Sequence, residues 1–363
     1  MTSLYKKTTL LFFSLCLLVQ LTFAASIADF EEGSYTNPVT KTVMKYRLFK
    51  PKNYDKTKLY PLVGFLHGAG EFDWQNNAQV TANDGCLYWA DDSIQNKYPS
   101  FIVAPNLHGN GETWANSHWS KGNYNQDDIT ISEGLQNYIN IIQELRKTYS
   151  IDSNRIYQTG LSMGGGGTWA SLTRFPNLFA AAIPICGYGD PSKMSLIKHI
   201  PIWTFHGKDD FVVNTENTRK LVAALKAAGG NVRYDEVPEP SGKDYDPHFV
   251  WLHTYHRRGK GYGLADWLFA QKKKGAITAS EGLTSIALSI KAFPNPSNGN
   301  ITLTLPNESF YELQVWDGTG KLVFNKQINN SLEQKLDLGG LPKGIYSVSA
   351  VGATTQRISV LVD

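Results

Sequence analysis

Short apolar runs alternate with helical segments between about residues 60 and 272, and this alternation limits the possible folds more than any other feature of the sequence. The clearest helical segment is 130–148, where Ile131, Leu135, Tyr138, Ile142 and Leu145 share one face. The apolar runs are typical of buried parallel strands; they are Leu62–Leu66, Phe101–Ala104, Ala181–Ile185 and Pro201–Phe205. The pattern predicts an α/β sandwich with a mostly parallel sheet and helices on both faces, which binds ligands at the carboxyl ends of its strands.

The first 24 residues do not belong to this fold. Lys6 and Lys7 precede an apolar run over residues 10–21, and Thr22-Phe23-Ala24 follows it as a small-residue cleavage site. This order predicts a signal peptide over residues 1–24. The alternative is a membrane anchor, but the run is short for a span of about 20 residues and no stop-transfer flank follows it. We therefore expect an exported protein without a stable membrane span.

Charge and cysteine content narrow the choice of partners. The formal net charge of the chain is +3, and removal of Lys6 and Lys7 with the signal peptide lowers it by two, to +1. Without a basic stripe that could neutralise phosphates, we expect no nucleic-acid partner. Cys16 leaves with the signal peptide, and Cys86 and Cys186 are too few for a disulfide framework. Two small buried apolar side chains are the favoured interpretation of these cysteines.

A change of composition after residue 272 predicts a second domain. Residues 273–286 are lysine-rich and then small and polar, as in a linker, so the first domain spans residues 25–272. Residues 287–363 alternate apolar and polar side chains between turn signals, and Gly318 and Gly320 mark a hairpin between Trp316 and Leu322. This pattern predicts a small all-β sandwich.

The motifs of this second domain resemble the C-terminal sorting domain of proteins exported by the type IX secretion system. They are Phe293-Pro294-Asn295-Pro296-Ser297-Asn298-Gly299, Asp317-Gly318-Thr319-Gly320-Lys321 and Leu341-Pro342-Lys343-Gly344-Ile345-Tyr346. The resemblance implies that the secretion machinery is a partner, and that the protein crosses the periplasm to be secreted or held at the cell surface. A carbohydrate-binding or structural β-sandwich is the alternative.

One serine in the first domain stands between glycines, in the order Gly160-Leu161-Ser162-Met163-Gly164. No lysine follows these glycines as a phosphate-binding loop requires, and Trp169 stands where a dinucleotide fingerprint needs its third glycine. The G-x-S-x-G pattern is typical of a nucleophile elbow, a strained turn between a strand and a helix. A strand over 155–159 and a helix over 163–173 are predicted on either side, so Ser162 is the candidate nucleophile.

A serine nucleophile needs a base, usually a histidine oriented by a carboxylate. Asp209 and Asp210 follow a predicted strand and are the candidate acids. His206 ends that strand and is more typical of a structural hydrogen bonder than of a base. The candidate bases downstream are His248, His253 and His256. They could instead form a metal site, but H-E-x-x-H and a neighbouring carboxylate are lacking, so we expect neither metal nor cofactor.

An acyl-transfer site also needs an oxyanion hole, formed by the backbone N–H after the nucleophile and by an N–H from a loop after an earlier strand. The first donor is then Met163. The loop His67-Gly68-Ala69-Gly70-Glu71 directly follows the strand Leu62–Leu66, and its glycines let the backbone turn an amide inward. Ala69 or Gly70 is therefore the expected second donor.

Over residues 45–272 these motifs resemble secreted α/β-hydrolases of the predicted-peptidase or carboxylesterase type, related to feruloyl and poly(3-hydroxybutyrate)-depolymerase-like esterases. The resemblance implies that Asp210, before Val212-Val213, is the acid. It also implies that His248, three residues before Trp251, is the base. The motifs that carry it are Tyr60-Pro61-Leu62, Leu66-His67-Gly68-Ala69-Gly70-Glu71, Asn154-Arg155-Ile156-Tyr157, Gly160-Leu161-Ser162-Met163-Gly164-Gly165, Pro184-Ile185-Cys186-Gly187, Phe205-His206-Gly207-Lys208-Asp209-Asp210 and His248-Phe249-Val250-Trp251.

The expected function is that of a secreted serine carboxylesterase with an acyl-enzyme intermediate, acting on ester substrates that include acetyl or feruloyl esters of polysaccharides. The alternatives are a serine peptidase with the same triad and a non-catalytic surface binding protein. Aromatic side chains stack on sugar and feruloyl rings. Trp114 and Trp119 in the loop 107–124, and Trp251 after the base, are therefore candidate substrate contacts. Packing of the loop onto the body is the alternative role for the two loop tryptophans.

Overall fold

The computed structural model describes residues 25–107, 112–238, 246–255, 263–273, 290–305, 310–328, 333–352 and 355–363. The predicted signal peptide and nearly all of the predicted linker lie outside these ranges.

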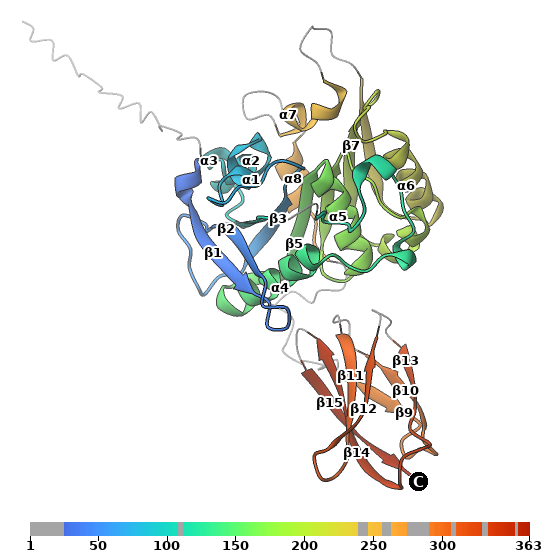
Figure 1. The fold of residues 1–363 in the computed structure, drawn as a ribbon. Coiled ribbons are helices and arrows are strands. Elements are labelled where there is room, and N and C mark those ends of the chain that lie inside the picture. The colour runs from blue at the N-terminus through green and yellow to red at the C-terminus, as the bar shows by residue number, and fades with distance from the viewer. Residues whose placement is uncertain are drawn as a thin grey trace, which may run out of the picture.

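The first domain is built on one eight-stranded sheet with the strand order β1-β2-β4-β3-β5-β6-β7-β8 (Figure 1). β1 and β2 pair with their neighbours in antiparallel orientation, and from β4 to β8 all neighbours are parallel. This confirms the predicted mostly parallel sheet. The strands are β1 (Phe30–Thr36), β2 (Val43–Phe49), β3 (Tyr60–Leu66), β4 (Phe101–Pro105), β5 (Ile151–Leu161), β6 (Ala181–Ile185), β7 (Ile202–Gly207) and β8 (Val232–Val237).

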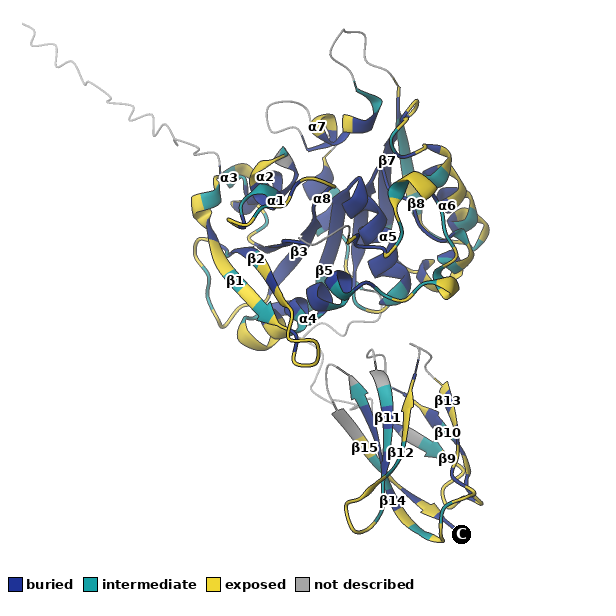
Figure 2. Ribbon diagram, in the orientation of Figure 1, coloured by how far each residue is buried: buried dark blue, intermediate teal, exposed yellow. Residues whose placement is uncertain are grey.

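Helices cover both faces of this sheet, and each face has its own apolar core. On one face, three helices (α4, α5 and α6) pack on strand residues such as Leu62 and Ile156. On the other face, three helices (α2, α3 and α8) pack on strand residues such as Val63 and Phe65. Buried residues fill the strands and the inner sides of the helices (Figure 2). The α-helices are α1 (Ala78–Thr81), α2 (Asp84–Ala90), α3 (Asp92–Gln95), α4 (Glu133–Thr148), α5 (Met163–Arg174), α6 (Glu216–Ala227), α7 (Trp251–Thr254) and α8 (Leu264–Phe269).

Among the described residues of this domain, five short 3₁₀-helices lie before or between the strands and α-helices. They are η1 (Ile27–Asp29), η2 (Trp119–Lys121), η3 (Gln126–Asp128), η4 (Pro191–Ile197) and η5 (Pro247–Phe249). Most of them follow the carboxyl ends of strands, where the predicted fold places its binding loops.

The second domain is all-β, with a three-stranded sheet in the order β13-β10-β9 and a four-stranded sheet in the order β12-β11-β14-β15. Leu303 of β10 and Val348 of β14 belong to one apolar cluster, so the two sheets share a core as a sandwich does. The predicted hairpin is present, since Trp316 pairs with Leu322. The strands are β9 (Lys291–Phe293), β10 (Asn300–Thr304), β11 (Phe310–Trp316), β12 (Leu322–Gln327), β13 (Glu333–Asp337), β14 (Gly344–Gly352) and β15 (Thr355–Val362).

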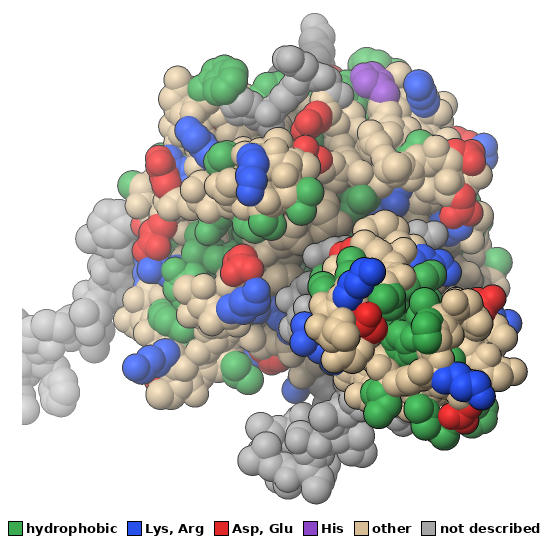
Figure 3. Space-filling view, turned by 60° about the horizontal axis from the view of Figure 1, so that its bottom comes forward, with side chains coloured by type: hydrophobic (Ala, Val, Ile, Leu, Met, Phe, Trp, Pro, Cys, Tyr) green, Lys and Arg blue, Asp and Glu red, His purple; other side chains and the backbone are tan. Residues whose placement is uncertain are grey.

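The surface agrees with the small net charge of the sequence. On the face drawn in Figure 3, acidic and basic side chains are interspersed, and neither sign gathers in one patch. Across the described ranges, none of the helices is both long enough and apolar enough to span a bilayer.

Candidate active site

Ser162 lies on the turn between β5 and α5, the place that the sequence predicts for a nucleophile elbow. Its backbone has φ 54° and ψ −118°, a conformation that costs a non-glycine residue of the order of 1–3 kcal/mol. The Ser162 N–H donates to the carbonyl of Ile185 at the end of the neighbouring strand β6, at 2.9 Å. This bond and the packing of β5 and α5 hold the strained residue in place.

The glycine two residues later is required by a close approach of backbone. A Cβ atom on Gly164 would lie 1.9 Å from the carbonyl oxygen of Leu66. The end of β3 therefore runs directly against the first turn of α5. Because the loop 67–71 follows Leu66 without a gap, the contact brings this loop beside Ser162.

The structure brings Ser162, His248 and Asp210 together. The hydroxyl oxygen of Ser162 lies 2.9 Å from Nε2 of His248, and Nδ1 of His248 lies 2.7 Å from Oδ2 of Asp210. An ionised carboxylate only accepts, so Nδ1 of His248 carries the proton and donates to Asp210. Nε2 then accepts from the Ser162 hydroxyl, which is the arrangement needed to remove the proton of a nucleophile. All three side chains are buried.

Four donors surround the carboxylate of Asp210. The backbone N–H groups of Val212 and Val213 both donate to Oδ1 at 2.9 Å, and His206 Nε2 lies 3.1 Å from Oδ2, which His248 also approaches. Burial alone would raise the pKa of Asp210, but the bonds from His206 and His248 outweigh it and hold the pKa below its usual value. Asp210 therefore stays charged.

His206 contributes to the site as the structural hydrogen bonder that its sequence position suggests. Its Nε2 lies 2.8 Å from the carbonyl of Val213 as well as near Asp210, so both neighbours are acceptors and Nε2 carries a proton. Its Nδ1 pairs with the hydroxyl of Thr218 in α6 at 2.7 Å. Sequence reasoning missed that His206 fixes the acid of the site.

We expect Asp210→Asn to lower kcat on the order of 10⁴-fold, because an amide can donate to Nδ1 and so favours the wrong histidine tautomer. Asp209→Asn is the matched control, since Asp209 is the adjacent residue and is exposed. Steady-state kinetics with p-nitrophenyl acetate would check both variants. Equal losses at the two positions would contradict the assignment of Asp210.

The turn that carries His248 is fixed at both ends. Asp246 accepts from the backbone N–H of His248 at 2.9 Å, and Pro247 begins η5. A Cβ atom on Gly207 would lie 1.9 Å from the carbonyl oxygen of Pro247, so only glycine at the end of β7 lets the turn approach Asp210. His253 lies on the exposed side of α7, and His256 lies outside the described residues.

The loop after β3 contains Ala69 and Gly70, which the sequence predicts as oxyanion donors. Ala69 and Gly70 are exposed, and Gly70 has φ 81°. Met163 is the first residue of α5, so its N–H has no acceptor inside the helix. His67, at the base of the loop, is fully buried; its Nε2 accepts from the Leu107 N–H at 3.0 Å. Burial lowers the pKa of His67 to about 4, which keeps its ring neutral.

Glu71 closes this loop and is itself buried, with 7% of its surface exposed. Its Oε2 accepts from the Gly68 N–H at 2.9 Å, and its Oε1 accepts from the side-chain amide of Asn83. Burial raises the pKa of Glu71 to about 7, and the Gly68 N–H offsets this only in part. Sequence reasoning gave Glu71 no role.

This raised pKa predicts a pH dependence of stability. Below the ordinary pKa of 4.5 Glu71 is neutral in the folded and unfolded states; as pH rises toward 7 the unfolded chain loses the proton first, which favours unfolding. The free energy of unfolding should therefore fall between about pH 4.5 and 7, by on the order of 2–3 kcal/mol. Urea titrations should show this slope in the wild type and not in Glu71→Gln. Identical slopes would contradict a raised pKa.

The three predicted substrate tryptophans have different surroundings, and two of them require correction. Trp114 is fully buried and its indole N–H donates to the carbonyl of His67 at 3.0 Å, so it packs the loop onto the body. Trp251 is also buried, with 3% exposed, and its indole N–H donates to Asn83 at 2.9 Å. Neither ring offers a face to a substrate. Trp119 is half-buried and stacks on His118, with ring centroids 3.9 Å apart.

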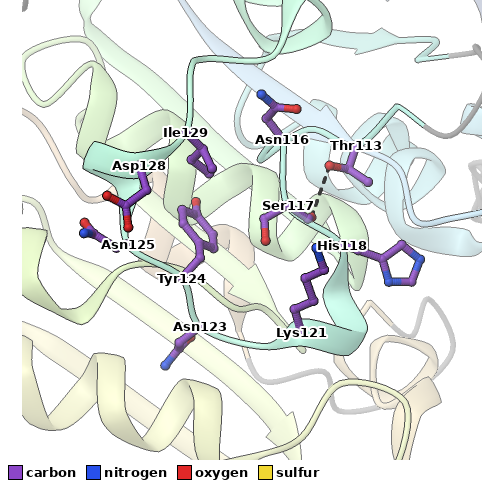
Figure 4. Close-up of a pocket in the computed structure, with 10 residues that line it drawn as sticks. All are labelled: Thr113, Asn116, Ser117, His118, Lys121, Asn123, Tyr124, Asn125, Asp128 and Ile129. Carbon is purple, nitrogen blue, oxygen red and sulfur yellow. Dashed lines mark hydrogen bonds between the residues drawn. The ribbon is translucent and has the colours of Figure 1, made fainter.

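A cavity of about 420 Å³ lies within the loop that carries Trp119. Figure 4 shows polar side chains around it, with Tyr124 and Ile129 as apolar walls. The ring of Tyr124 contacts that of Tyr188, which follows β6 and packs on α5 at Gly166. The described lining residues of the cavity do not include Ser162, Asp210 or His248. It is lined by Thr113, Asn116, Ser117, His118, Lys121, Asn123, Tyr124, Asn125, Asp128 and Ile129.

Within the described residues, one cluster has ligand atoms spaced to hold a metal: Cys186, Asp210 and His248, all within 4.8 Å of one another. Burial raises the pKa of the Cys186 thiol well above its usual value, so it stays protonated and is a poor ligand. Asp210 and His248 are already bonded to each other. Cys86 and Cys186 are both buried, as the favoured interpretation of the sequence predicts.

Comparisons with known proteins agree with this fold. A thermostable esterase of known structure is 44% identical and has a TM-score of 0.62; the match covers 68% of this chain and 64% of that one. A poly(3-hydroxyalkanoate) depolymerase C of Paucimonas lemoignei is 25% identical over 56% of this chain and 55% of its own. A bifunctional acetylxylan esterase/xylanase of Neocallimastix patriciarum is 33% identical over 24% of this chain and 13% of its own. The chain thus spans less than two thirds of each of these relatives.

Two family models match parts of the chain. Residues 100–204, which include Ser162, match the prolyl oligopeptidase family, and residues 291–362 match the secretion system C-terminal sorting domain. The second match confirms the resemblance noted for the C-terminal motifs. The chain therefore has an α/β-hydrolase fold. It is similar over about two thirds of its length to a thermostable esterase, and residues 291–362 match the secretion system C-terminal sorting domain.

Proposed function

We propose that this protein is a serine carboxylesterase that works through an acyl-enzyme. The observation that carries the proposal is the continuous hydrogen-bonded series Ser162–His248–Asp210, with distances of 2.9 and 2.7 Å, on a strained turn at the N-terminus of α5. Such a series activates a hydroxyl that is otherwise a poor nucleophile. The 44% identity to a thermostable esterase supports an ester as the substrate.

In this proposal the Ser162 oxygen attacks the ester carbonyl while His248 takes its proton. The developing oxyanion accepts from the N–H of Met163 and from that of Ala69 or Gly70. His248 then returns the proton to the leaving alcohol, and the acyl group stays on Ser162. Water, deprotonated by His248, attacks the acyl-enzyme and releases the acid, which restores the serine hydroxyl. Asp210 stabilises the imidazolium in both halves of the reaction.

The alcohol part of the substrate is proposed to be a polysaccharide, esterified with acetyl or feruloyl groups. The cavity beside Trp119 supports this, because Asn125, Lys121 and Asp128 offer donors and acceptors around a space that suits a sugar. One relative is named an acetylxylan esterase/xylanase. Export by the type IX system, through the periplasm to the surface or the medium, would bring the enzyme to such polymers, and the C-terminal sorting domain supports that route.

Hydrolysis of a substrate panel tests the proposal. Purified mature protein should hydrolyse p-nitrophenyl acetate, methyl ferulate or acetylated xylan, and a Ser162→Ala variant should not. A serine peptidase on the same triad is the alternative, so peptide substrates belong to the panel. Cleavage of peptides without cleavage of any ester would overturn the esterase proposal.

A further inference from the structure

A buried series of hydrogen bonds joins the loop after β3 to the turn that carries His248, and the reaction described above does not use it. It runs from the Trp251 indole N–H to Oδ1 of Asn83 at 2.9 Å, from the Asn83 amide to Oε1 of Glu71, and from Oε2 of Glu71 to the Gly68 N–H at 2.9 Å. At one end the Trp251 ring packs edge-on against the His248 ring, with centroids 4.9 Å apart and planes at 86°. At the other end, Gly68 directly precedes Ala69 in the loop of residues 67–71, which we call the oxyanion loop.

In every hydrogen bond of this series, the donor and the acceptor are fixed by the chemistry of the groups. An indole N–H can only donate, so the Asn83 atom that faces Trp251 must be the amide oxygen. The Asn83 NH₂ group then faces Glu71, whose Oε1 has to accept. Oε2 also has to accept, because its partner is the backbone N–H of Gly68. Only a carboxylate at position 71 satisfies all three donors at once.

The side chain of Asn83 takes part in this series of hydrogen bonds and does not cap the helix that it precedes. It occupies the N-cap position of α2, where an asparagine side chain ordinarily accepts from the first turn, yet it makes no such bond here. Its carbonyl and amide groups are instead both used between Glu71 and Trp251.

We infer that Glu71 is a positioning residue which, through Asn83 and Trp251, fixes the oxyanion loop relative to the ring of the general base His248. The inference rests on the proposed esterase function. The two halves of the site come from segments far apart in sequence, since Asn83 and Trp251 are separated by 168 positions. Catalysis needs a fixed distance between the oxyanion loop and the His248 ring, because the oxyanion and the transferred proton belong to the same transition state.

Glu71 faces one further titratable side chain, Tyr255, from the turn after α7. Burial is the main cause of the raised pKa of Tyr255, and the charge of Glu71 adds a small part; the Tyr255 hydroxyl lies 2.5 Å from that of Thr159 in β5. Tyr255 therefore stays neutral and adds no second negative charge beside Glu71. Burial raises the pKa of Glu71 to about 7, so the carboxylate predominates above that pH and the assays below are run there.

A rescue experiment tests the inference with p-nitrophenyl acetate. Glu71→Gln places an NH₂ group against either the Asn83 amide or the Gly68 N–H, and we expect kcat to fall at least tenfold with little change in KM. Trp251→Phe keeps a ring against His248 but removes the indole donor, which frees the Asn83 amide to turn its oxygen toward the NH₂ group introduced at position 71. The double variant should therefore recover kcat above that of Glu71→Gln alone. Glu144→Gln, at an exposed position in α4, is the matched control.

Two outcomes overturn the inference: wild-type kcat in Glu71→Gln, or losses that multiply in the double variant. Should Glu71→Gln fail to fold, Asn83→Ala at a half-buried position breaks the same link and must lower kcat; wild-type kcat there would also overturn it. Ser162→Ala is assayed in parallel. If wild-type turnover does not exceed that of Ser162→Ala, the proposed function fails. An active wild type with an unaffected Glu71→Gln refutes only the positioning role.

Discussion

Replacing Ser162 with alanine should lower kcat for p-nitrophenyl acetate by on the order of 10⁴- to 10⁶-fold, as the loss of a triad nucleophile does. The hydroxyl of Ser162, which directly follows β5, lies 2.9 Å from Nε2 of His248. Its removal leaves the base without a proton to take. The backbone of the elbow is held by the Ser162 N–H bond to Ile185, which alanine retains.

The fold of this variant should therefore remain intact, with a circular dichroism spectrum and Tm close to those of the wild type. Steady-state kinetics at saturating ester measures the loss. Near-wild-type turnover in a folded Ser162→Ala protein would show that the elbow is not the site of reaction.

Replacing His248 with alanine should be as damaging as the loss of Ser162, because members of such a triad act as a unit and not additively. Without His248 the serine proton has no acceptor, and the charged Asp210 loses the partner that lies 2.7 Å away. Kinetics with the same ester, and with added imidazole as an external base, would measure the loss and its recovery.

His253→Ala is the matched control, since His253 is only five residues further along and is exposed on α7. Its effect on kcat should be small. A severe loss in His253→Ala beside a mild loss in His248→Ala would move the role of base to His253.

Apolar runs predicted the centre of the sheet but not its edges. The strands β3, β4, β6 and β7 are buried on both faces, so their residues have to be apolar and stand out in the sequence. The edge strands β1 and β8 were missed, because they contain Glu31, Glu32, Arg233 and Asp235 on exposed or half-buried positions. An edge strand can be polar, and its pairing is then decided by tertiary contacts.

The candidate site was predictable where its chemistry is local. The elbow depends on glycine spacing around Ser162 and on the strand and helix beside it, all within one short stretch. The choice between neighbouring candidates came from resemblance to a family, which favoured Asp210 over Asp209 as the acid and His248 over His253 as the base. Local sequence does not distinguish these neighbours, because they differ in their position in the fold. Among the described residues, only Asp210 and His248 of these four belong to the buried series with Ser162.

The supporting contacts could not be predicted, since they join segments far apart in the chain. Glu71, Asn83 and Trp251 come from three separate segments of the chain, and His206 lies near the end of β7, from where it reaches Asp210. For Trp114 the sequence left two roles open, substrate contact and packing of its loop. The ring packs against Gly167 in α5, where an added Cβ would lie 2.4 Å from Trp114 Cβ, which agrees with the packing role.

Labelling with a fluorophosphonate tests most directly whether Ser162 is an activated nucleophile. The serine oxygen displaces fluoride from phosphorus, so mass spectrometry should find one phosphonyl group per chain of the mature protein, on the peptide that contains Ser162. The label should be absent from the Ser162→Ala and His248→Ala variants, and it should abolish ester hydrolysis in proportion to its incorporation. A wild-type protein that hydrolyses esters yet remains unlabelled, or carries the label on another serine, would contradict the account.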